Sequence, residues 1–110
     1  MPAGIWLAKF GVIVFDFFGY VPYHVGSSLE TKDWRDVDVR LILPDEVFDE
    51  MFGRVKNTSN KKLAAITLAF SSLGKEMTGL PIDFQIQPQT WANKNYKGPR
   101  SALIEVPYIE

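Results

Sequence analysis

The sequence contains no cysteine and a single histidine, His24, among its 110 residues. Without cysteine there can be no disulfide framework and no thiolate metal site, and this composition fits a reducing compartment such as the cytoplasm. Zinc sites of the usual kind need several cysteine or histidine ligands, so a single histidine argues against them as well. We therefore expect a cytoplasmic protein without disulfides or structural zinc.

An excess of positive charge is also missing, because 12 Lys and Arg stand against 13 Asp and Glu. This balance gives no electrostatic reason to expect tight nonspecific binding to a nucleic-acid backbone. A small molecule, a protein or a short RNA end all remain open as acceptors or partners. The length of 110 residues predicts one domain, residues 1–110, since it is too short for a catalytic domain plus a separate substrate domain.

No hydrophobic run is long and uninterrupted enough to predict a membrane span. The most apolar stretch, residues 5–20, is broken by Lys9 and Asp16 and falls short of the roughly 20 residues that a bilayer requires. Read as a helix, it places Lys9, Asp16 and Tyr20 in one narrow polar stripe. A small sheet can cover only one side of such a helix, so residues 5–20 predict a contact surface for a homodimer or a partner protein. The alternative is a strand around residues 12–15, which favour β-structure.

Turn and cap residues divide the remaining chain into short elements. We expect a strand over residues 23–25, a polar loop over 29–35, a strand over 36–43, a helix over 45–52, a helix capped within 57–60 that ends near 77, a strand over 82–87, a loop or lid over 88–99, and a strand or docking segment over 102–106. The pattern predicts an α+β sandwich with a small mixed sheet and helices mainly on one face.

The polar faces of two expected strands hold the main functional signal. Side chains alternate along a strand, so Asp36 and Asp38 point away from the core, and Asp83 does the same in the later strand. If the two strands are neighbours, three carboxylates converge, which is costly without a cation because like charges raise each other's pKa. Magnesium prefers such hard oxygen ligands and often binds substrate phosphates, so one or two Mg²⁺ ions would suit the site.

A turn of small residues, Gly26-Ser27-Ser28, comes shortly before the first two carboxylates. Glycine would let the backbone approach phosphates closely, and serine would add a hydroxyl and an amide. Arg35 directly precedes Asp36, and Lys32 lies in the same loop, so either basic side chain could contact a phosphate. Together with the carboxylates, this turn predicts a site for phosphoryl chemistry.

These residues resemble the nucleotidyltransferases of the DNA polymerase beta type, especially the small stand-alone members. The resemblance spans roughly residues 5–87 and rests on Gly26-Ser27, on Asp36-x-Asp38 in a hydrophobic strand and on Asp83 in a later strand. It implies Mg²⁺-dependent transfer of a nucleoside monophosphate from a nucleoside triphosphate to a hydroxyl of a protein, an RNA end or a small molecule. The three aspartates would be the catalytic and metal-binding residues.

The resemblance also assigns the turn to the nucleotide, with one departure from the family pattern. Gly26, Ser27 and Ser28 would bind the phosphates, whereas the Arg-Gly pair that often follows the turn in small members is absent here. Arg35 is our candidate to replace that arginine. The chain also lacks the extra helical domain of larger relatives, so a partner subunit would complete the site.

Two other functions remain open at this stage. The first is a binding module of the same fold without turnover, for example an antitoxin or assembly partner that acts through its apolar N-terminal helix. The second is a metal-dependent phosphodiesterase or nuclease, which would use similar carboxylates without the Gly-Ser turn. A solvated strand face is the plain structural alternative for the aspartates.

Several further residues have both a functional and a structural interpretation. Aromatic and basic residues near the C-terminus would hold a base or an oligonucleotide end, or would form a loop anchored by a tryptophan: Trp91, Lys94, Tyr96, Lys97 and Arg100. Arg40 and Gln85 would orient the carboxylates or simply be exposed. His24 would reach a phosphate or, as is commoner for a lone histidine, belong to packing.

Overall fold

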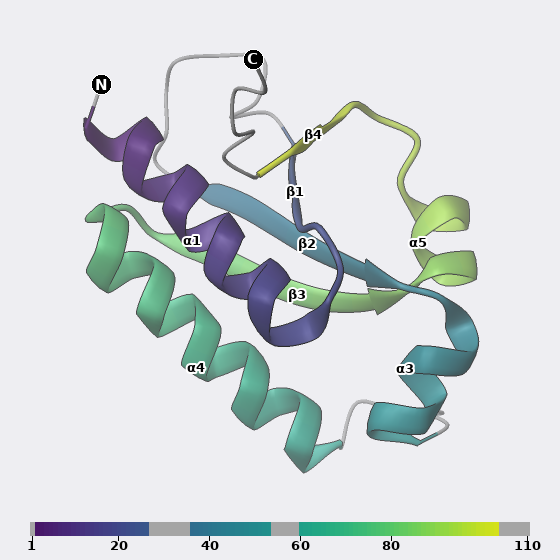
Figure 1. Ribbon diagram of the computed structural model, residues 1–110. Coiled ribbons are helices and arrows are strands. Elements are labelled where there is room, and N and C mark those ends of the chain that lie inside the picture. Colours follow the sequence, from purple (N-terminus) through teal and green to yellow (C-terminus); the bar gives the residue numbers. More distant parts are fainter. Residues whose placement is uncertain (1, 27–35, 54–59, 104–110) are drawn as a thin grey trace, which may run out of the picture.

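The computed structural model describes residues 2–26, 36–53 and 60–103, which form helices around a mixed sheet. In chain order the elements are α1 (Pro2–Phe18), β1 (Tyr23–Val25), β2 (Val37–Leu43), α3 (Asp45–Phe52), α4 (Lys61–Thr78), β3 (Ile82–Pro88), α5 (Gln89–Asn95) and β4 (Arg100–Ala102). The strand order is β3-β2-β1-β4, with β2 and β3 parallel and β1 antiparallel to both of its neighbours. Figure 1 shows α1 and α4 crossing one face, and α3 and α5 where β2 and β3 end. The predicted α+β fold is confirmed.

Alternation along the strands explains why the two long helices, α1 and α4, cover the same face of the sheet. Every second residue of β2 is buried, from Val37 to Leu43, while the residues between them are partly exposed. In β3 the buried side chains of Ile82, Phe84 and Ile86 alternate with polar residues in the same way. Hydrophobic residues at period two therefore give each strand one apolar face, which must be covered, and one polar face, which need not be.

Aromatic contacts join the two covering helices to the sheet. Phe10 of α1 meets Phe84 edge-on at a ring-centroid distance of 6.1 Å, and Phe70 of α4 lies 5.5 Å from the same ring. At the edge of the sheet, the Ser71 hydroxyl accepts a hydrogen bond of 3.1 Å from the Phe84 backbone N–H. Helix α4 thus covers the face of β3 and also satisfies a backbone donor on its open side.

Cap residues set the limits of α3 and α4 as predicted. Pro44 precedes α3, and its first turn contains Asp45 and Glu46 at the positive end of the helix dipole. The Asn60 side chain accepts a 2.8 Å hydrogen bond from the Leu63 N–H and begins α4. Gly79 ends that helix in the left-handed conformation, with φ 74°.

The expected loop over residues 88–99 is wrong for its first half, which forms α5. The Asp45 carboxylate accepts a 2.9 Å hydrogen bond from the Thr90 N–H and so caps this seven-residue helix from another element. Ala92 is buried and anchors the helix to the sheet, whereas Trp91 is 52% exposed. The tryptophan is therefore not the anchor of this segment.

The N-terminal run forms a helix rather than a strand. Helix α1 packs on the sheet through Leu7, Phe10 and Val14, and Gly11 lies against the backbone of Leu103 just beyond β4. Strand β4 pairs with β1 and begins two residues before the expected segment, whose residues 104–106 lie outside the described residues. Within the described residues, none of the helices has the length and apolar character needed to cross a bilayer.

Candidate functional site

Two of the three predicted carboxylates lie side by side on the face of the sheet opposite α1 and α4. Asp38 of β2 and Asp83 of β3 are direct partners in the parallel register. Because both alternate with buried apolar residues, both project from the uncovered face. Their side chains are 33% and 51% exposed, respectively, so a solvent-borne ligand can reach them.

Arg40, also on β2, supplies a cation between these carboxylates. Its Nη2 lies 3.2 Å from Oδ2 of Asp83 and 3.9 Å from Oδ1 of Asp38. Its Nη1 donates a 2.7 Å hydrogen bond to the Asp83 backbone carbonyl. The arginine side chain is only 16% exposed, so it is held in this position rather than extended into solvent. The guanidinium offsets the repulsion that two adjacent carboxylates would otherwise create.

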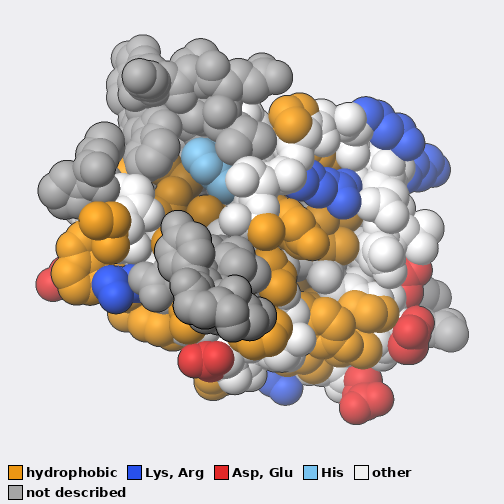
Figure 2. Space-filling model, turned by 45° about the horizontal axis from the view of Figure 1, so that its top comes forward, with side chains coloured by type: hydrophobic (Ala, Val, Ile, Leu, Met, Phe, Trp, Pro, Cys, Tyr) orange, Lys and Arg blue, Asp and Glu red, His pale blue; other side chains and the backbone are white. Residues whose placement is uncertain are grey.

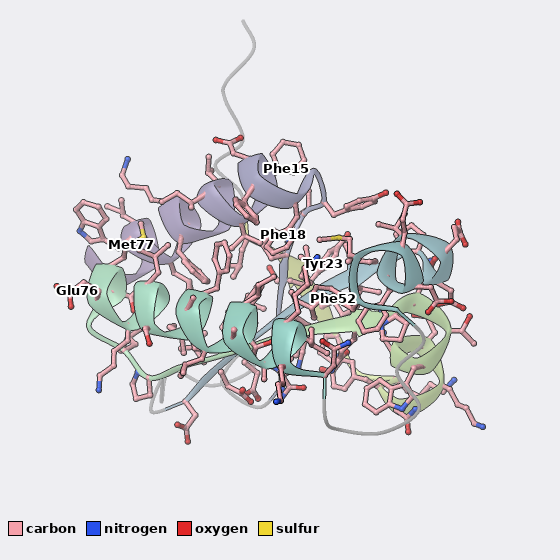
Figure 3. All side chains as sticks on the ribbon, turned by 90° about the horizontal axis from the view of Figure 1, so that it is seen from below. Phe15, Phe18, Tyr23, Phe52, Glu76 and Met77 are labelled. Carbon is pink, nitrogen blue, oxygen red and sulfur yellow. The ribbon has the colours of Figure 1, made fainter. Side chains whose placement is uncertain are left out.

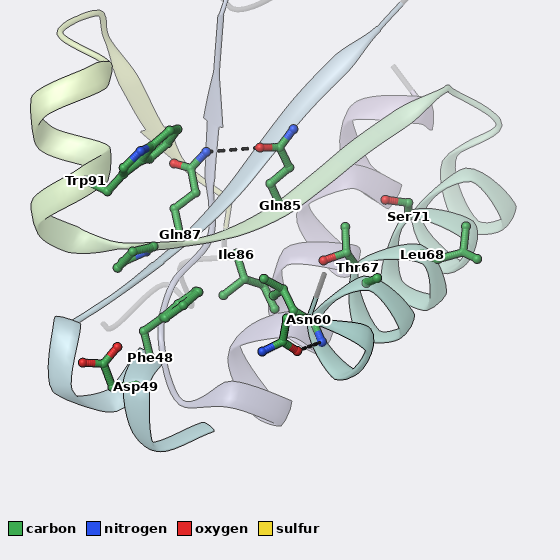
Figure 4. Close-up of a pocket in the computed structure, with 13 residues that line it drawn as sticks. Phe48, Asp49, Asn60, Thr67, Leu68, Ser71, Gln85, Ile86, Gln87 and Trp91 are labelled. Atoms are coloured by element: carbon green, nitrogen blue, oxygen red, sulfur yellow. Dashed lines mark hydrogen bonds between the residues drawn. The ribbon is translucent and has the colours of Figure 1, made fainter. Parts of the chain in front are cut away.

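A row of amides continues the polar face along β3. The Gln87 Nε2 donates to the Gln85 Oε1 at 3.2 Å, a contact drawn in Figure 4. The Gln85 Nε2 in turn lies 3.4 Å from both carboxylate oxygens of Asp83. Asp83 is thus approached by donors from Arg40 and from Gln85, which together fix the orientation of its carboxylate. This supports the orienting role expected for both residues.

Burial and charge affect the two titratable groups nearest the site in opposite ways. The pKa of Asp38 is raised, chiefly by partial burial of its carboxylate, and the negative charges of Asp83 and Asp36 raise it further. Arg40 and His24 act in the opposite direction and lower it. Burial lowers the pKa of His24, and the Asp38 charge partly offsets that effect. His24 is 5% exposed and lies on β1, which fits its interpretation as a packing residue. A raised carboxylate pKa at a solvent-accessible position is typical of functional sites.

Gly26 brings the end of β1 into direct contact with this site. Its φ is 86°, and a Cβ at this position would lie 2.6 Å from Oδ2 of Asp38. Its backbone N–H donates a 3.1 Å hydrogen bond to the Tyr96 hydroxyl, which itself donates to the Pro99 carbonyl at 2.8 Å. Only glycine combines this backbone conformation with such close contact. No pattern in the sequence predicts that the Tyr96 hydroxyl accepts a hydrogen bond from Gly26.

Two adjoining hollows border β3, the smaller over the polar face and the larger along the open edge of the strand. The smaller, of about 260 Å³, is lined by Val25, Gly26, Asp38, Arg40, Ile42, Gln85, Gln87, Trp91, Asn95, Tyr96 and Arg100. The larger, of about 700 Å³, runs between α4, β3 and α5 and is shown in Figure 4. Both are lined by Gln85, Gln87 and Trp91, so they form neighbouring parts of one concave surface. A ligand at the carboxylates could extend over the half-exposed indole of Trp91.

The basic residues near the C-terminus divide into structural and exposed groups. Arg100 donates to Oδ1 of Asn93 at 3.0 Å and lies 5.7 Å from the Tyr96 ring centroid, so it holds the end of α5. Lys94 and Lys97 are exposed. On the face drawn in Figure 2, the largest group of Lys and Arg side chains lies at the upper right, with others at the left and the lower edge. These exposed lysines can attract an anionic ligand toward the smaller hollow.

The remaining predicted site residues have different outcomes. Asp36 is exposed just before β2 and contributes to the field at Asp38. Ser27, Ser28 and Arg35 lie outside the described residues, as does Lys32. Within residues 2–26, 36–53 and 60–103, no group of three or more His, Asp or Glu is arranged to hold a metal ion. Asp38 and Asp83 offer two hard oxygen donors, and in this structure the Arg40 guanidinium is the cation that pairs with both of them.

Comparison of the chain with protein-family models, with curated proteins and with solved structures finds no match.

Proposed function

We propose that this protein is a Mg²⁺-dependent nucleotidyltransferase, which moves a nucleoside monophosphate from a nucleoside triphosphate to a hydroxyl acceptor. The observation that supports it best is the position of Asp38, which is the strand partner of Asp83 and also lies against Gly26 at the end of β1. The φ of 86° at Gly26 favours glycine there, and the missing side chain leaves backbone close to Asp38, where a phosphate could approach it.

In this proposal Asp38 and Asp83 hold the metal, and Asp36 adds negative charge beside them. Bound Mg²⁺ would neutralise phosphate charge and so lower the barrier to attack at the α-phosphorus. Gly26 and the following Ser27 and Ser28 would bind the β- and γ-phosphates, with Arg35 as a further phosphate contact. The half-exposed Trp91 would stack against the base.

Asp83 would also accept the proton of the attacking hydroxyl. The acceptor oxygen then forms a bond to the α-phosphorus, the bond from that phosphorus to the bridging oxygen breaks, and pyrophosphate leaves. Arg40 and Gln85 would keep the Asp83 carboxylate aimed at the acceptor through the contacts that both make with it. The reaction would take place in a reducing compartment such as the cytoplasm, with a protein, an RNA end or a small molecule as acceptor.

One observation favours a second candidate, a binding module of the same fold that does not turn over. The Arg40 guanidinium already lies between the two carboxylates and offsets their repulsion, so the fold does not depend on a metal there. Such a module would bind a nucleotide or a partner without transferring phosphate.

The test combines transfer, binding and cleavage in one series. The protein is incubated with radiolabelled ATP, CTP, GTP or UTP and Mg²⁺, with itself, short RNA and simple alcohols as acceptors. The variants are Asp38→Asn and Asp83→Asn, with Glu76→Gln on the exposed surface of α4 as the matched control. Mn²⁺ and nonhydrolysable triphosphate binding are measured in parallel by calorimetry.

Each outcome selects a different function. Label transfer that survives Glu76→Gln and disappears in both aspartate variants supports the enzyme. Metal-dependent nucleotide binding without transfer supports the binding module, and RNA cleavage without transfer supports a nuclease. If neither Mn²⁺ nor any triphosphate binds, the proposal is overturned.

A further inference from the structure

The larger hollow, along the open edge of β3, is lined by exposed apolar side chains. Seven large hydrophobic side chains are exposed among the described residues, and five of these belong to α1. The other two, Leu68 on α4 at 69% and Trp91 on α5 at 52%, both line this hollow. Figure 4 shows them on opposite sides of it. Exposed apolar side chains that gather around one concavity mark a binding surface.

The strand that borders the hollow has an unpaired edge. Among the described strands, β3 pairs on one side only, with β2. The Phe84 N–H faces away from β2, because it donates to the Ser71 hydroxyl of α4. Backbone groups of alternate residues face the same side of a strand, so the N–H and C=O of Ile86 face the open edge too. No residue in the described part of the chain hydrogen-bonds to Ile86 on that side.

Helix α4 covers the first half of this edge and leaves the second half open. Gly74 of α4 lies against Ile82 at the start of β3, where a Cβ would come within 2.9 Å of the Ile82 side chain. Residues 85–88 instead line the hollow. Pro88, which ends the strand, has no N–H to offer, as is usual at a strand edge. A chain paired here would therefore bind mainly to the backbone of Ile86.

The walls of the hollow are fixed by packing on their far sides. Phe18 lies between α1 and α4, as Figure 3 shows, with its ring centroid 5.3 Å from that of Phe70. On α5, Ala92 is buried, and the Asp45 carboxylate accepts a hydrogen bond from the Thr90 N–H. The hollow is thus a preformed groove, which lowers the entropy cost of binding in it.

The recessed position of the edge selects a single extended peptide as the occupant. A second copy of this chain would bring α4 and α5 along with its own β3, because both helices line that edge. Those helices would have to fit into the same hollow as the strand. A peptide without flanking structure can enter, and its backbone supplies partners for Ile86. A small apolar ligand would leave those backbone groups unpaired in a desolvated site, which is costly.

We propose that the larger hollow binds an extended peptide, which pairs with Ile86 and adds a strand to the edge of β3. Side chains of an added strand alternate between the two faces of the sheet. Figure 4 shows Ile86 pointing away from the side on which Gln85 and Gln87 lie. Peptide side chains on the side of Ile86 would enter the apolar part of the hollow, near Phe48 and Leu63. Those on the opposite side would meet the two amides.

Asp49 gives the peptide a charge preference. It is exposed on α3, and among the described residues it is the charged member of the lining. A lysine or arginine at one end of the peptide would complement it. The occupant is therefore an extended peptide with a large apolar residue beside Ile86 and a basic residue toward α3. Its binding requires neither a metal nor phosphoryl transfer, so it is independent of the proposed function.

A phage-displayed library of random peptides of about seven residues, an ordinary strand length, supplies the probe. Selected peptides are synthesised, and their binding to the whole protein is measured by calorimetry. Each backbone N–H of the tightest peptide is then methylated in turn. Only alternate N–H groups of a strand face its neighbour, so methylation should weaken binding roughly tenfold or more at alternate positions and little at those between.

Surface variants locate the peptide on the protein. Leu68→Glu places a charge in the apolar hollow and should weaken binding roughly tenfold or more. Ala69→Glu is the matched control, because it adds the same charge to an exposed position of α4 that does not line the hollow. Ala64→Glu, at another exposed lining position, is the second variant. Circular dichroism and urea unfolding should show an intact fold in all three.

The charge preference has its own pair of variants. Asp49→Asn should weaken binding of a basic peptide by about twofold to fivefold, since the pair is exposed. Glu50→Gln, at the next and equally exposed position of α3 outside the lining, should leave binding unchanged.

Several results would overturn the proposal. One is a library from which no binding peptide is selected, and another is a peptide whose affinity survives both Leu68→Glu and Ala64→Glu. Sensitivity to methylation at consecutive positions would indicate a bound helix instead of a strand. A wild-type dimer that Leu68→Glu dissociates would make a second copy the occupant.

Discussion

Arg40 on β2 contacts Asp83 on β3 twice, through a 2.7 Å hydrogen bond from Nη1 to the backbone carbonyl and a 3.2 Å approach of Nη2 to the carboxylate Oδ2. The same Nη2 lies 3.9 Å from Asp38, so one guanidinium links the two carboxylates of the candidate site. The two strands are joined there by side chains as well as by their backbone register. Replacing the arginine should therefore reveal how much the carboxylates repel each other.

We expect Arg40→Gln to lower the free energy of unfolding by about 0.5 to 1 kcal/mol in the absence of divalent ions, since the pair is partly exposed and screened by solvent. The loss arises because Asp38 and Asp83 then face each other without a cation. Urea unfolding in chelator measures it. Adding Mg²⁺ should recover more stability in the variant than in the wild type if the carboxylates bind the ion.

A double variant supplies the control for this prediction. Combining Arg40→Gln with Asp83→Asn removes one of the two like charges, so the added cost of losing the arginine should largely disappear. If Arg40→Gln lowered the free energy of unfolding equally in the wild type and in Asp83→Asn, Arg40 would stabilise the fold through its backbone contact and packing instead.

Local patterns were sufficient to predict most elements of the fold. Alternating residues gave β2 and β3 their inner and outer faces, and the Asn60 cap and Gly79 gave α4 its limits. Helix α5 was missed because its cap comes from Asp45, forty-five positions before Thr90 in the chain. A contact between elements so far apart leaves no periodic signal near the helix that it stabilises.

The candidate site was likewise predictable only where it depends on local patterns. Strand alternation correctly placed Asp38 and Asp83 on polar faces, and the parallel register makes them neighbours. The contact of Gly26 with Asp38 and its hydrogen bond to Tyr96 depend on how the chain returns after α5, which the sequence does not encode locally. The position of Arg40 between the carboxylates likewise depends on a rotamer that only packing determines.

Gly26→Ala should separate the structural cost of the turn from its functional one. Any non-glycine residue at φ 86° carries a strain of about 1 to 3 kcal/mol. The new methyl group would also meet Asp38 Oδ2 at 2.6 Å, but a carboxylate is the free end of a side chain and can rotate away. We therefore expect Gly26→Ala to lower the free energy of unfolding only by the backbone strain. We also expect it to bind Mn²⁺ or triphosphate much more weakly than the wild type.

Gly19→Ala is the matched control, because Gly19 has φ 81° and nothing within 4 Å of its would-be Cβ. Urea unfolding should give similar losses for the two variants, while calorimetry should show ligand binding impaired only in Gly26→Ala. A far larger stability loss at Gly26 would show that the Asp38 carboxylate cannot move.

The free energy of unfolding should fall as the pH is lowered from the unfolded pKa of His24 toward its lower folded pKa. Burial lowers the pKa of His24 in the folded protein, so near pH 6 the unfolded chain binds more protons and is favoured. The contribution of His24 is complete above its unfolded pKa of about 6.5 and is lost as the pH falls toward the folded value. Asp38 acts in the opposite sense, because its raised pKa means that the folded state takes up the proton first.

His24→Asn isolates this effect, since the chain has one histidine and no other imidazole titrates in the range. Urea unfolding between pH 5.5 and 7.5, with chelator present, should show a smaller slope in the variant than in the wild type. Equal slopes would mean that His24 takes up its proton equally well in the folded and unfolded chain.

Gly11 presents the sharpest packing constraint on α1. A Cβ there would lie 1.7 Å from the Leu103 carbonyl oxygen, which belongs to the backbone and cannot rotate away. Helix propensity alone would make alanine better than glycine by about 1 kcal/mol. Overpacking costs typically 1 to 3 kcal/mol and more when backbone must move, so Gly11→Ala should be destabilising by about 1 to 3 kcal/mol overall.

Gly74→Ala on α4 provides the comparison, because it gains the same propensity but meets only the Ile82 side chain, at 2.9 Å. The nearest atoms of Ile82 include its Cβ at 3.1 Å, which moves only with the strand backbone. Gly74→Ala should therefore also lower the midpoint of urea unfolding, but by less than Gly11→Ala because its contacts are longer. Helix content measured by circular dichroism should stay constant in both variants. If Gly11→Ala proved as stable as Gly74→Ala, Leu103 would not be packed against α1 in solution.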